Sequence, residues 1–345
     1  MTQQPQFAVE IYHDVAPYLA GVSEKEFFLD ADQLVRSWKA ATEWTLDTFH
    51  GRIPPRQPTA APNSYGHLMC LGAPIRYSDN AEPNVLPAAD SLEDAVKLLE
   101  AAQGMDFTAC PIFKQYAELS ARLREVFPDS PRLGGLVAEG PLTSAVLFRG
   151  TDFYMDLIDN PELSQYYLSL FTESSLAFRA TVRTFCGLPP VDDTCDRFAD
   201  DLASFVPPSL WDDMVVPFWK RHFEGMTTGK EHPLHCEALV PAHLPYLAKA
   251  GVTHYQPSVS PHITLESLRA NTDLPFDWLL YMYHVTEMTD QQIADWVADA
   301  IPYGPTQLRT QLGAYTIQSG KVDRITAFLD VADSYQTAPR AHASR

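Results

Sequence analysis

The 345-residue chain has no apolar run approaching the roughly 18 residues that a membrane-spanning helix requires. Its first residues, MTQQPQFAVEIYHD, lack the basic and apolar regions of a secretory signal peptide. Cysteine is also scarce, because the five cysteines are odd in number, scattered and never spaced as CxxC. This usage argues against a disulfide framework and against a structural zinc module. We therefore expect a cytoplasmic protein without a membrane span.

Basic residues are also few relative to acidic ones. The chain has 25 Lys and Arg against 44 Asp and Glu, for a formal net charge of −19, and its basic residues form no dense cluster. A chain of this charge repels phosphate backbones and anionic lipid surfaces. We therefore expect a small-molecule ligand, and neither a nucleic acid nor a membrane as a partner.

Several common binding and catalytic motifs are missing. No GxGxxG follows an expected strand, and neither GxxxxGKS/T nor GxSxG occurs. Dinucleotide-binding, nucleoside-triphosphate-binding and serine-hydrolase functions therefore lose their usual support.

The hydrophobic pattern divides the chain into three parts. Apolar residues recur at helical spacing in residues 24–50, and a proline-rich stretch follows at 51–66. From about residue 60, short apolar runs alternate with helical patterns, which is typical of βα units and a parallel sheet. We predict a helical N-terminal extension at 1–58, an α/β barrel at 59–337 and a flexible tail at 338–345. The expected strands are RLGGLVAEG (132–140), RFADDLASF (197–205), HPLHCEAL (232–239), VTHYQPSV (252–259), DWLLYMYHV (277–285) and AYTIQS (314–319).

Polar residues near the expected strand ends are the candidate site, because catalytic groups of α/β barrels lie where the strands end. In HPLHCEAL, His235 and Glu237 are two residues apart and leave the same face of a strand. Imidazole and carboxylate together suit a divalent metal, although a His hydrogen-bonded to Glu needs none. His284 ends an apolar run and is the third candidate ligand. The alternative is that these three polar residues are unrelated and surround a wet barrel mouth.

Three further polar residues are candidate catalytic groups. His254 lies in the expected strand THYQPS, and Asp200 and Asp201 are adjacent in FADDLASF. On a strand, neighbouring side chains point to opposite faces, so only one of the two aspartates faces the barrel interior. That carboxylate is expected to hold a cationic or NH-bearing substrate or to act as a general base, and the other to cap a helix or remain solvated.

The order of several segments resembles the uroporphyrinogen decarboxylase superfamily, which includes zinc-dependent corrinoid methyltransferases. The resemblance implies a (β/α)8 barrel. It also places Asn63 where the decarboxylases have an essential Asp, and Ala314 where they have a His. Asn cannot accept a proton as a carboxylate does, so porphyrinogen decarboxylation is not expected. The segments are HLMCLGAPIRY, EPNV, EGPLTSAVLFRGTDFYMDLIDNPEL, FADDLASFVPPSLWDDMVVPFWKRHFEGM, HPLHCEALVPAHLPYLAKAGVTHYQPSVSP and QLGAYTIQSGKVDRITAFLDVA.

The methyltransferase branch matches somewhat better. Its strand His-x-Cys reads His235-x-Glu237 here, and its later Cys ligand falls on Ala314. The resemblance implies zinc as the metal, with iron and manganese as alternatives because oxygen and nitrogen donors harden the site. It also implies a corrinoid protein as a candidate partner and a homodimer as a candidate assembly.

These observations lead to one expected function and two alternatives. We expect a metal-dependent methyl or one-carbon transfer on a small organic substrate, with His235, Glu237 and His284 as metal ligands. Asp200 or Asp201, together with Asn63 and His254, would orient the substrate. The alternatives are a metal-free decarboxylase or lyase acting on a small carboxylic acid, and a catalytically lapsed barrel that serves as a binding subunit.

Overall fold

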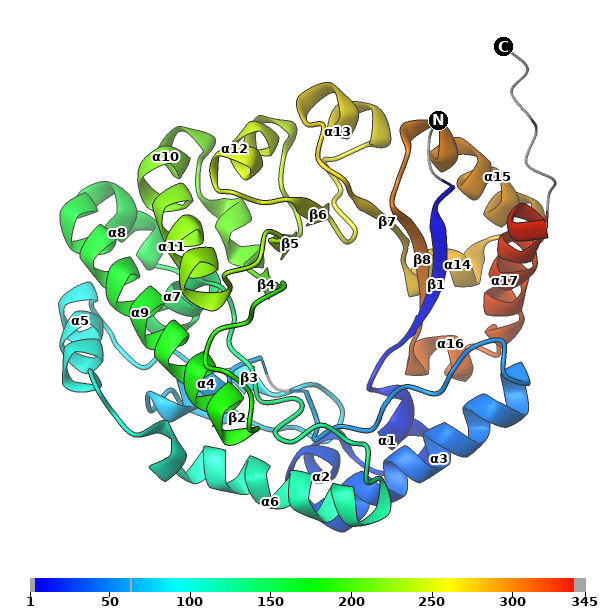
Figure 1. Cartoon of the computed structure of the whole chain (residues 1–345), viewed down its shortest axis with the longest axis horizontal. Coiled ribbons are helices and arrows are strands. Elements are labelled where there is room, and N and C mark those ends of the chain that lie inside the picture. The colour runs from blue at the N-terminus through cyan, green and yellow to red at the C-terminus, as the bar shows by residue number, and fades with distance from the viewer. Residues whose placement is uncertain (1–3, 63, 196, 338–345) are drawn as a thin grey trace.

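In the computed structural model, parallel strands lie inside a ring of helices (Figure 1). The structure describes residues 4–62, 64–195 and 197–337. No helix among these residues is long and apolar enough to cross a membrane. The parallel strands and the surrounding helices confirm the α/β class that the sequence predicted.

The strands form two parallel three-stranded sheets. One has the order β1-β8-β7 and the other β4-β5-β6, and an isolated parallel bridge between Tyr255 and Phe276 lies between β6 and β7. Within the described residues the pairing thus runs from β4 round to β1 without closing into a complete barrel. A short antiparallel pair, β2 and β3, stands apart. The strands are β1 (Gln6–Ile11), β2 (Ile75–Arg76), β3 (Asn84–Val85), β4 (Phe198–Ala199), β5 (Pro233–His235), β6 (His254–Gln256), β7 (Asp277–Leu280) and β8 (Gln307–Leu312).

Helices surround the strands and supply most of the apolar core. Those before β4 are α1 (Val15–Ala20), α2 (Glu24–Leu29), α3 (Ala31–Phe49), α4 (Gly66–Cys70), α5 (Leu92–Ala101), η1 (Phe107–Ala109), α6 (Pro111–Val126), α7 (Pro141–Arg149), α8 (Phe153–Asp159) and α9 (Pro161–Phe185). Those after β4 are η2 (Asp201–Phe205), η3 (Pro208–Leu210), α10 (Trp211–Met214), α11 (Val216–Met226), η4 (Pro241–His243), α12 (Leu244–Lys249), α13 (Leu265–Asn271), α14 (Met282–Glu287), α15 (Asp290–Ala300), η5 (Ile301–Tyr303), α16 (Ala314–Gln318) and α17 (Val322–Thr337).

The N-terminal region contains the predicted helices and one strand that was not predicted. Residues 24–50 form α2 and α3, and the apolar stripe of α3 is buried at Leu34, Val35 and Trp38. Residues 6–11 form β1, which pairs in parallel with all six residues of β8. The first 58 residues are therefore not a purely helical extension, because β1 belongs to the sheet. The predicted tail at 338–345 lies outside the described residues.

Two of the predicted strands are wrong. AYTIQS forms α16, and the strand lies one segment earlier, in QLRTQL. Alternation is typical of a half-buried strand, but this segment has only two apolar residues, Leu308 and Leu312, so its signal is weak. RLGGLVAEG forms one isolated bridge, at Ala138, because Leu133 and Gly135 have positive φ angles of 50° and 98°, which interrupt an extended strand.

Strand alternation separates an apolar outer face from a polar inner face. Leu308 and Leu312 of β8 pack outward with Phe328 of α17 in one hydrophobic cluster. Arg309 and Gln311, between them in the sequence, therefore point inward. The apolar core thus lies between strands and helices, and the ring of strands encloses polar side chains.

Candidate functional site

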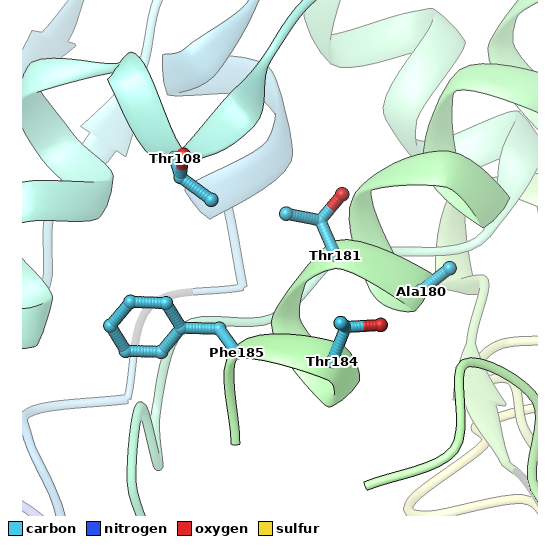
Figure 2. A pocket seen from close by; sticks show the side chains of 5 residues that line it. All are labelled: Thr108, Ala180, Thr181, Thr184 and Phe185. Atoms are coloured by element: carbon cyan, nitrogen blue, oxygen red, sulfur yellow. The ribbon is translucent and has the colours of Figure 1, made fainter. Parts of the chain in front are cut away.

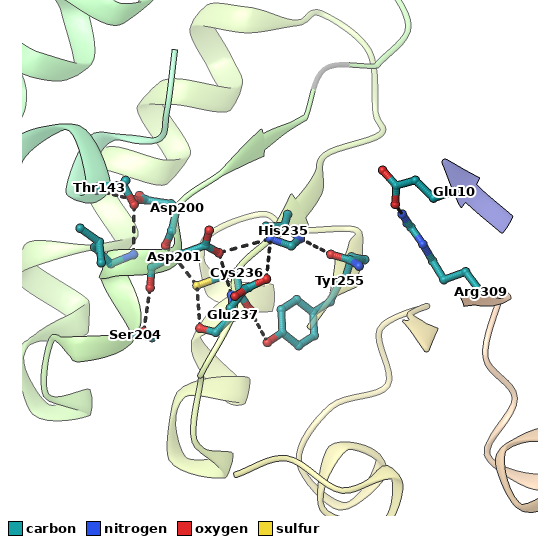
Figure 3. A network of polar contacts seen from close by, with 12 residues as sticks. Glu10, Thr143, Asp200, Asp201, Ser204, His235, Cys236, Glu237, Tyr255 and Arg309 are labelled. Atoms are coloured by element: carbon teal, nitrogen blue, oxygen red, sulfur yellow. Dashed lines mark hydrogen bonds and ion pairs between the residues drawn. The ribbon is translucent and has the colours of Figure 1, made fainter. Parts of the chain in front are cut away.

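The space between the strands holds an ionic network whose side chains come from four strands. Arg309 of β8 pairs with Glu10 of β1, as Figure 3 shows, and its Nη1 lies 3.8 Å from Asp277 Oδ2 on β7. The other oxygen of Asp277 lies 2.9 Å from His254 Nε2 on β6. Barrel interiors are usually filled with branched aliphatic side chains, so this interior is unusually polar. His254, a predicted catalytic residue, is thus held by Asp277 in this network.

His235 lies at the end of β5 between two carboxylates (Figure 3). Its Nε2 is 3.4 Å from Asp201 Oδ1 and 3.5 Å from Glu237 Oε1, while its Nδ1 bonds to the amide oxygen of Gln256. About a third of the His235 side chain is exposed. His235 and Glu237, predicted to leave the same face of one strand, are in contact, but β5 ends at His235 and Glu237 lies in the loop that follows.

The charge of His235 follows from these partners. Burial lowers the pKa of His235, but the hydrogen bond with Glu237, the charge of Asp201 and the bond with Gln256 outweigh it and raise the pKa to about 9. The same hydrogen bond lowers the pKa of Glu237. At neutral pH the imidazole is therefore a cation, and both ring nitrogens donate hydrogen bonds.

Asp200 and Asp201 point in different directions. The sequence left open which of the two faces the interior. Asp200 is fully buried, and its carboxylate accepts from Thr143 N at 2.6 Å, Leu142 N at 3.2 Å and Trp219 Nε1 at 2.6 Å. Burial raises the pKa of Asp200 to about 6, although these hydrogen bonds oppose the rise. Asp200 therefore anchors the start of α7 and the indole of Trp219.

Asp201 is the aspartate that faces His235. Its Oδ1 accepts a hydrogen bond from the backbone N–H of Glu237 at 2.8 Å, and 38% of its side chain is exposed. Burial raises the pKa of Asp201, and the positive charge of His235 opposes the rise. Asp201 thus ties the loop after β4 to the loop after β5 at the point where both strands end.

Glu139 belongs to the same cluster, and the sequence analysis did not single it out. Burial raises the pKa of Glu139 to about 8, and the charges of Asp201 and Asp200 add to the rise, while a hydrogen bond with Ser64 and the charge of His235 oppose it. Glu139 precedes the Gly140–Pro141 turn that opens α7. Its position directly before that turn was the only available sign of its role. At neutral pH this carboxyl group is mostly protonated.

Two tyrosines converge on this cluster from other strand ends. Burial raises the pKa of Tyr12, which follows β1, and the charges of Glu82, Glu10, Tyr281 and Glu237 raise it further. Tyr281 follows β7. Burial is the largest cause that raises the pKa of Tyr281, and the charges of Tyr283 and Glu237 add to the rise. Acidic and phenolic groups from β1, β5 and β7 therefore lie close enough to influence one another.

His284, the third predicted metal ligand, does not lie at a strand end. His284 is exposed and lies within α14, because β7 ends at Leu280 and the chain turns into a helix at Met282. The contact recorded for its ring is an edge-to-face one with Tyr281. The strand end predicted at His284 is therefore wrong. Asn63 lies outside the described residues.

The donor groups do not fit the predicted zinc centre. No group of three His, Cys, Asp or Glu side chains within the described ranges is placed to hold a metal ion. His235 would have to lose a proton that its carboxylate neighbours stabilise. Cys236 points away from His235, is fully buried and donates its thiol to Asp200 O at 3.1 Å. Metal binding stays a prediction, to be tested by metal analysis of the purified protein.

A cavity elsewhere has a different character. It measures about 420 Å³ and lies along the C-terminal part of α9 (Figure 2). Methyl, hydroxyl and phenyl groups line it, and none of its lining residues carries a charge. Because none of its side chains is an acid or a base that could activate a hydroxyl, we place the candidate site at the strand ends. The lining residues are Thr108, Ala180, Thr181, Thr184 and Phe185.

The fold belongs with α/β proteins whose parallel strands lie inside a ring of helices. No family model matches the chain, and no curated protein sequence matches it. Among solved structures it is similar to a methyltransferase from Methanosarcina mazei, with a TM-score of 0.66 and 16% sequence identity. The similarity covers 98% of this chain and 95% of that one. At this identity it shows a shared fold.

Proposed function

We propose that the protein is an enzyme that transfers a methyl or other one-carbon group from a small organic substrate, with His235 as the proton donor. The observation that carries the proposal is the partly exposed imidazolium of His235, held by Asp201 and Glu237 at the end of β5. The fold shared with a methyltransferase gives independent support for this class of reaction. The position of His235 agrees with the rule that catalytic groups lie at the carboxyl ends of parallel strands.

A leaving oxygen, or a leaving nitrogen that carries no positive charge, needs a proton as its bond to the methyl carbon breaks. A protonated amine leaves as the neutral amine, which takes a proton from His235 once its lone pair has formed. The bond between the methyl carbon and a substrate oxygen or nitrogen breaks, and its electron pair stays on that oxygen or nitrogen. His235 Nε2 gives its proton to the departing atom, while a lone pair of the acceptor forms the new bond to carbon. Asp201 and Glu237 keep His235 charged before the transfer and orient its ring. Glu139, which interacts electrostatically with Asp201 and His235 and is mostly protonated at neutral pH, is a second candidate proton donor.

We also infer that the strands belong to a (β/α)8 barrel. Two hydrogen bonds beside the paired strands support this inference. Gly140 N donates to Ala199 O next to β4, and Arg56 donates to Ile11 O next to β1. The backbone bond extends the pairing beyond β4, and the bond from the Arg56 side chain places the segment that contains Arg56 beside β1. The corrinoid partner and the homodimer stay predictions.

The other two functions receive less support. A small carboxylic acid, the substrate of the alternative decarboxylase, would meet the carboxylates of Glu10, Asp201 and Glu237. A lapsed binding subunit would not need a charged imidazole kept between two acids at a partly exposed strand end. Both alternatives are outcomes of the following experiment.

The test is a screen for methyl transfer with carbon-13-labelled methyl ethers and methylamines, offered with thiol and cob(I)alamin acceptors. We expect a labelled product whose rate of formation falls as pH rises through about 9, because His235 then loses its proton. His235→Gln should lower the rate about 10²- to 10⁴-fold. His262→Gln, at an exposed histidine, is the control and should leave it unchanged. Carbon dioxide release without methyl transfer would favour the decarboxylase, and no turnover of any compound would favour the binding subunit.

A further inference from the structure

One buried amide in the interior lacks a partner. Gln311 of β8 is 7% exposed, and its side-chain oxygen has no hydrogen-bond partner within the part of the chain that the structure describes. Gln311 shares the inward face of β8 with Arg309 and lies directly opposite Glu10 of β1. A buried carbonyl oxygen without a donor costs about 1–3 kcal/mol. This oxygen is therefore placed to accept a hydrogen bond from a bound molecule.

The charged groups near Gln311 determine which molecule fits. Arg309 is already paired with Glu10 and Asp277, and His235 is already paired with Asp201 and Glu237. In these two networks the carboxylates of Glu10, Asp277, Asp201 and Glu237 face the cations Arg309 and His235, and His254 is bonded to Asp277. Arg56 interacts electrostatically with Glu10, and the carboxylates of Asp14 and Glu82 act on Tyr12 or Tyr281, so carboxylates still outnumber cations in this region. An anion entering this space would meet net negative charge, whereas a cation would meet partners.

Aromatic rings add a second feature that favours a cation. Tyr12 and Tyr281 follow β1 and β7, and both are partly exposed. Tyr281 also packs against Tyr283, with 5.3 Å between ring centroids. The faces of tyrosine rings attract alkylammonium groups, whose positive charge spreads over the carbons attached to nitrogen.

We infer that this interior binds the cationic, N–H-bearing end of a small organic substrate, such as a methylated ammonium group. Its N–H donates to the side-chain oxygen of Gln311, Glu10 and Glu237 balance its charge, and the rings of Tyr12 and Tyr281 pack against its methyl groups. The assignment of the occupant as substrate rests on the proposed function. The binding itself does not, because it is measured without turnover.

Isothermal titration of the intact protein at pH 7 and constant ionic strength tests the inference with four probes of similar shape. Trimethylammonium carries charge and one N–H, tetramethylammonium carries charge alone, tert-butanol is neutral and pivalate is an anion. We expect trimethylammonium to bind most tightly, tetramethylammonium more weakly, tert-butanol at least about tenfold more weakly than trimethylammonium, and pivalate not at all.

A variant pair then isolates Gln311. Gln311→Leu should weaken trimethylammonium binding about 10- to 150-fold and change tetramethylammonium binding less than about twofold, since only trimethylammonium donates a charge-assisted hydrogen bond to the amide oxygen. Gln307→Leu, on the same face of β8 but four residues earlier, is the matched control and should change neither. Thermal unfolding of both variants checks that they fold.

Three results would overturn the inference: binding of neither cation, tighter binding of pivalate than of trimethylammonium, or an equal effect of Gln311→Leu on both cations. If Gln311→Leu does not fold, the ranking of the four probes on the unaltered protein still decides the sign of the charge. Cation binding without any methyl transfer would contradict the proposed function and leave the inference standing.

Discussion

Asp200 and Asp201 are adjacent in sequence, yet the structure gives them different surroundings. Asp200 is enclosed by three N–H donors, whereas Asp201 faces His235 and solvent. We expect Asp200→Asn to lower the free energy of unfolding by about 1–3 kcal/mol, because the new amide N–H₂ must face one of those donors. Asp201→Asn should change it by less than about 1 kcal/mol.

The two variants control for each other in urea unfolding and in the methyl-transfer assay. Asp201→Asn should reduce the rate of transfer at least about tenfold while the unfolding midpoint stays close to that of the parent protein. A large loss of stability in Asp201→Asn, with Asp200→Asn unaffected, would contradict the positions assigned to them.

At the scale of single residues, the sequence predicted part of the site. Alternation predicted that His235 and Glu237 share a face and that Asp200 and Asp201 do not, but it gave no way to choose the inward aspartate. His284 was misplaced because the turn after Leu280 leaves no mark in an apolar run. Glu139 was missed because its pKa depends on burial and on charges from distant segments, which no local pattern reports.

At the scale of elements, the start of α7 packs directly against the end of β4 at Gly140. A Cβ added at Gly140 would lie 2.5 Å from Asp200 Cβ and 2.8 Å from Ala199 O. Its φ of −65° is ordinary, so the glycine is required by this close approach and not by its backbone angle.

We therefore expect Gly140→Ala to lower the free energy of unfolding by about 1–3 kcal/mol, as overpacking does, because α7 must move away from Asp200. Urea unfolding measures this loss. Ser144→Ala, one turn later in α7, removes a 3.3 Å hydrogen bond to Glu139 O and should cost about 1 kcal/mol or less. An unchanged unfolding midpoint for Gly140→Ala would mean that α7 and β4 are not packed as described.

The accuracy of the predicted elements depended on where the apolar residues lie. The stripe of α3 and the short buried runs at β4, β5, β6 and β7 are visible in the sequence, so a helix and four strands were predicted in the right places. β1 and β8 were missed because inward Glu10, Arg309 and Gln311 interrupt the apolar pattern. The polar interior thus hid the two strands that carry part of the proposed binding site.

At the scale of the whole molecule, two buried histidines link stability to pH. His67 and His222 are fully buried, and neither ring nitrogen of His222 has a hydrogen-bond partner among the described residues. Burial lowers the pKa of His67 to about 3 and that of His222 well below 6.5. Below pH 6.5 the unfolded chain gains protons at these sites and the folded chain does not, so their neutral burial costs stability as pH falls.

Replacing His222 should remove that cost. We expect the free energy of unfolding of His222→Leu, relative to the parent protein, to rise by about 1.4 kcal/mol for each pH unit from 6.5 down to about 4.5. Urea unfolding at several pH values measures this slope, and His262→Leu at an exposed site is the control. A constant difference between variant and parent across this range would show that His222 titrates normally in the folded protein.

The pairing of β1 with β8 also affects how the chain folds during synthesis. The partners Gln6 and Gln307 are about 300 residues apart, so at about 5–20 residues per second β1 leaves the ribosome roughly 15–60 s before β8 exists. During that time β1 has an open edge that other strands can join. A nascent chain stalled before residue 307 therefore cannot form this pair, and the edge of β1 that β8 covers in the folded protein stays unpaired.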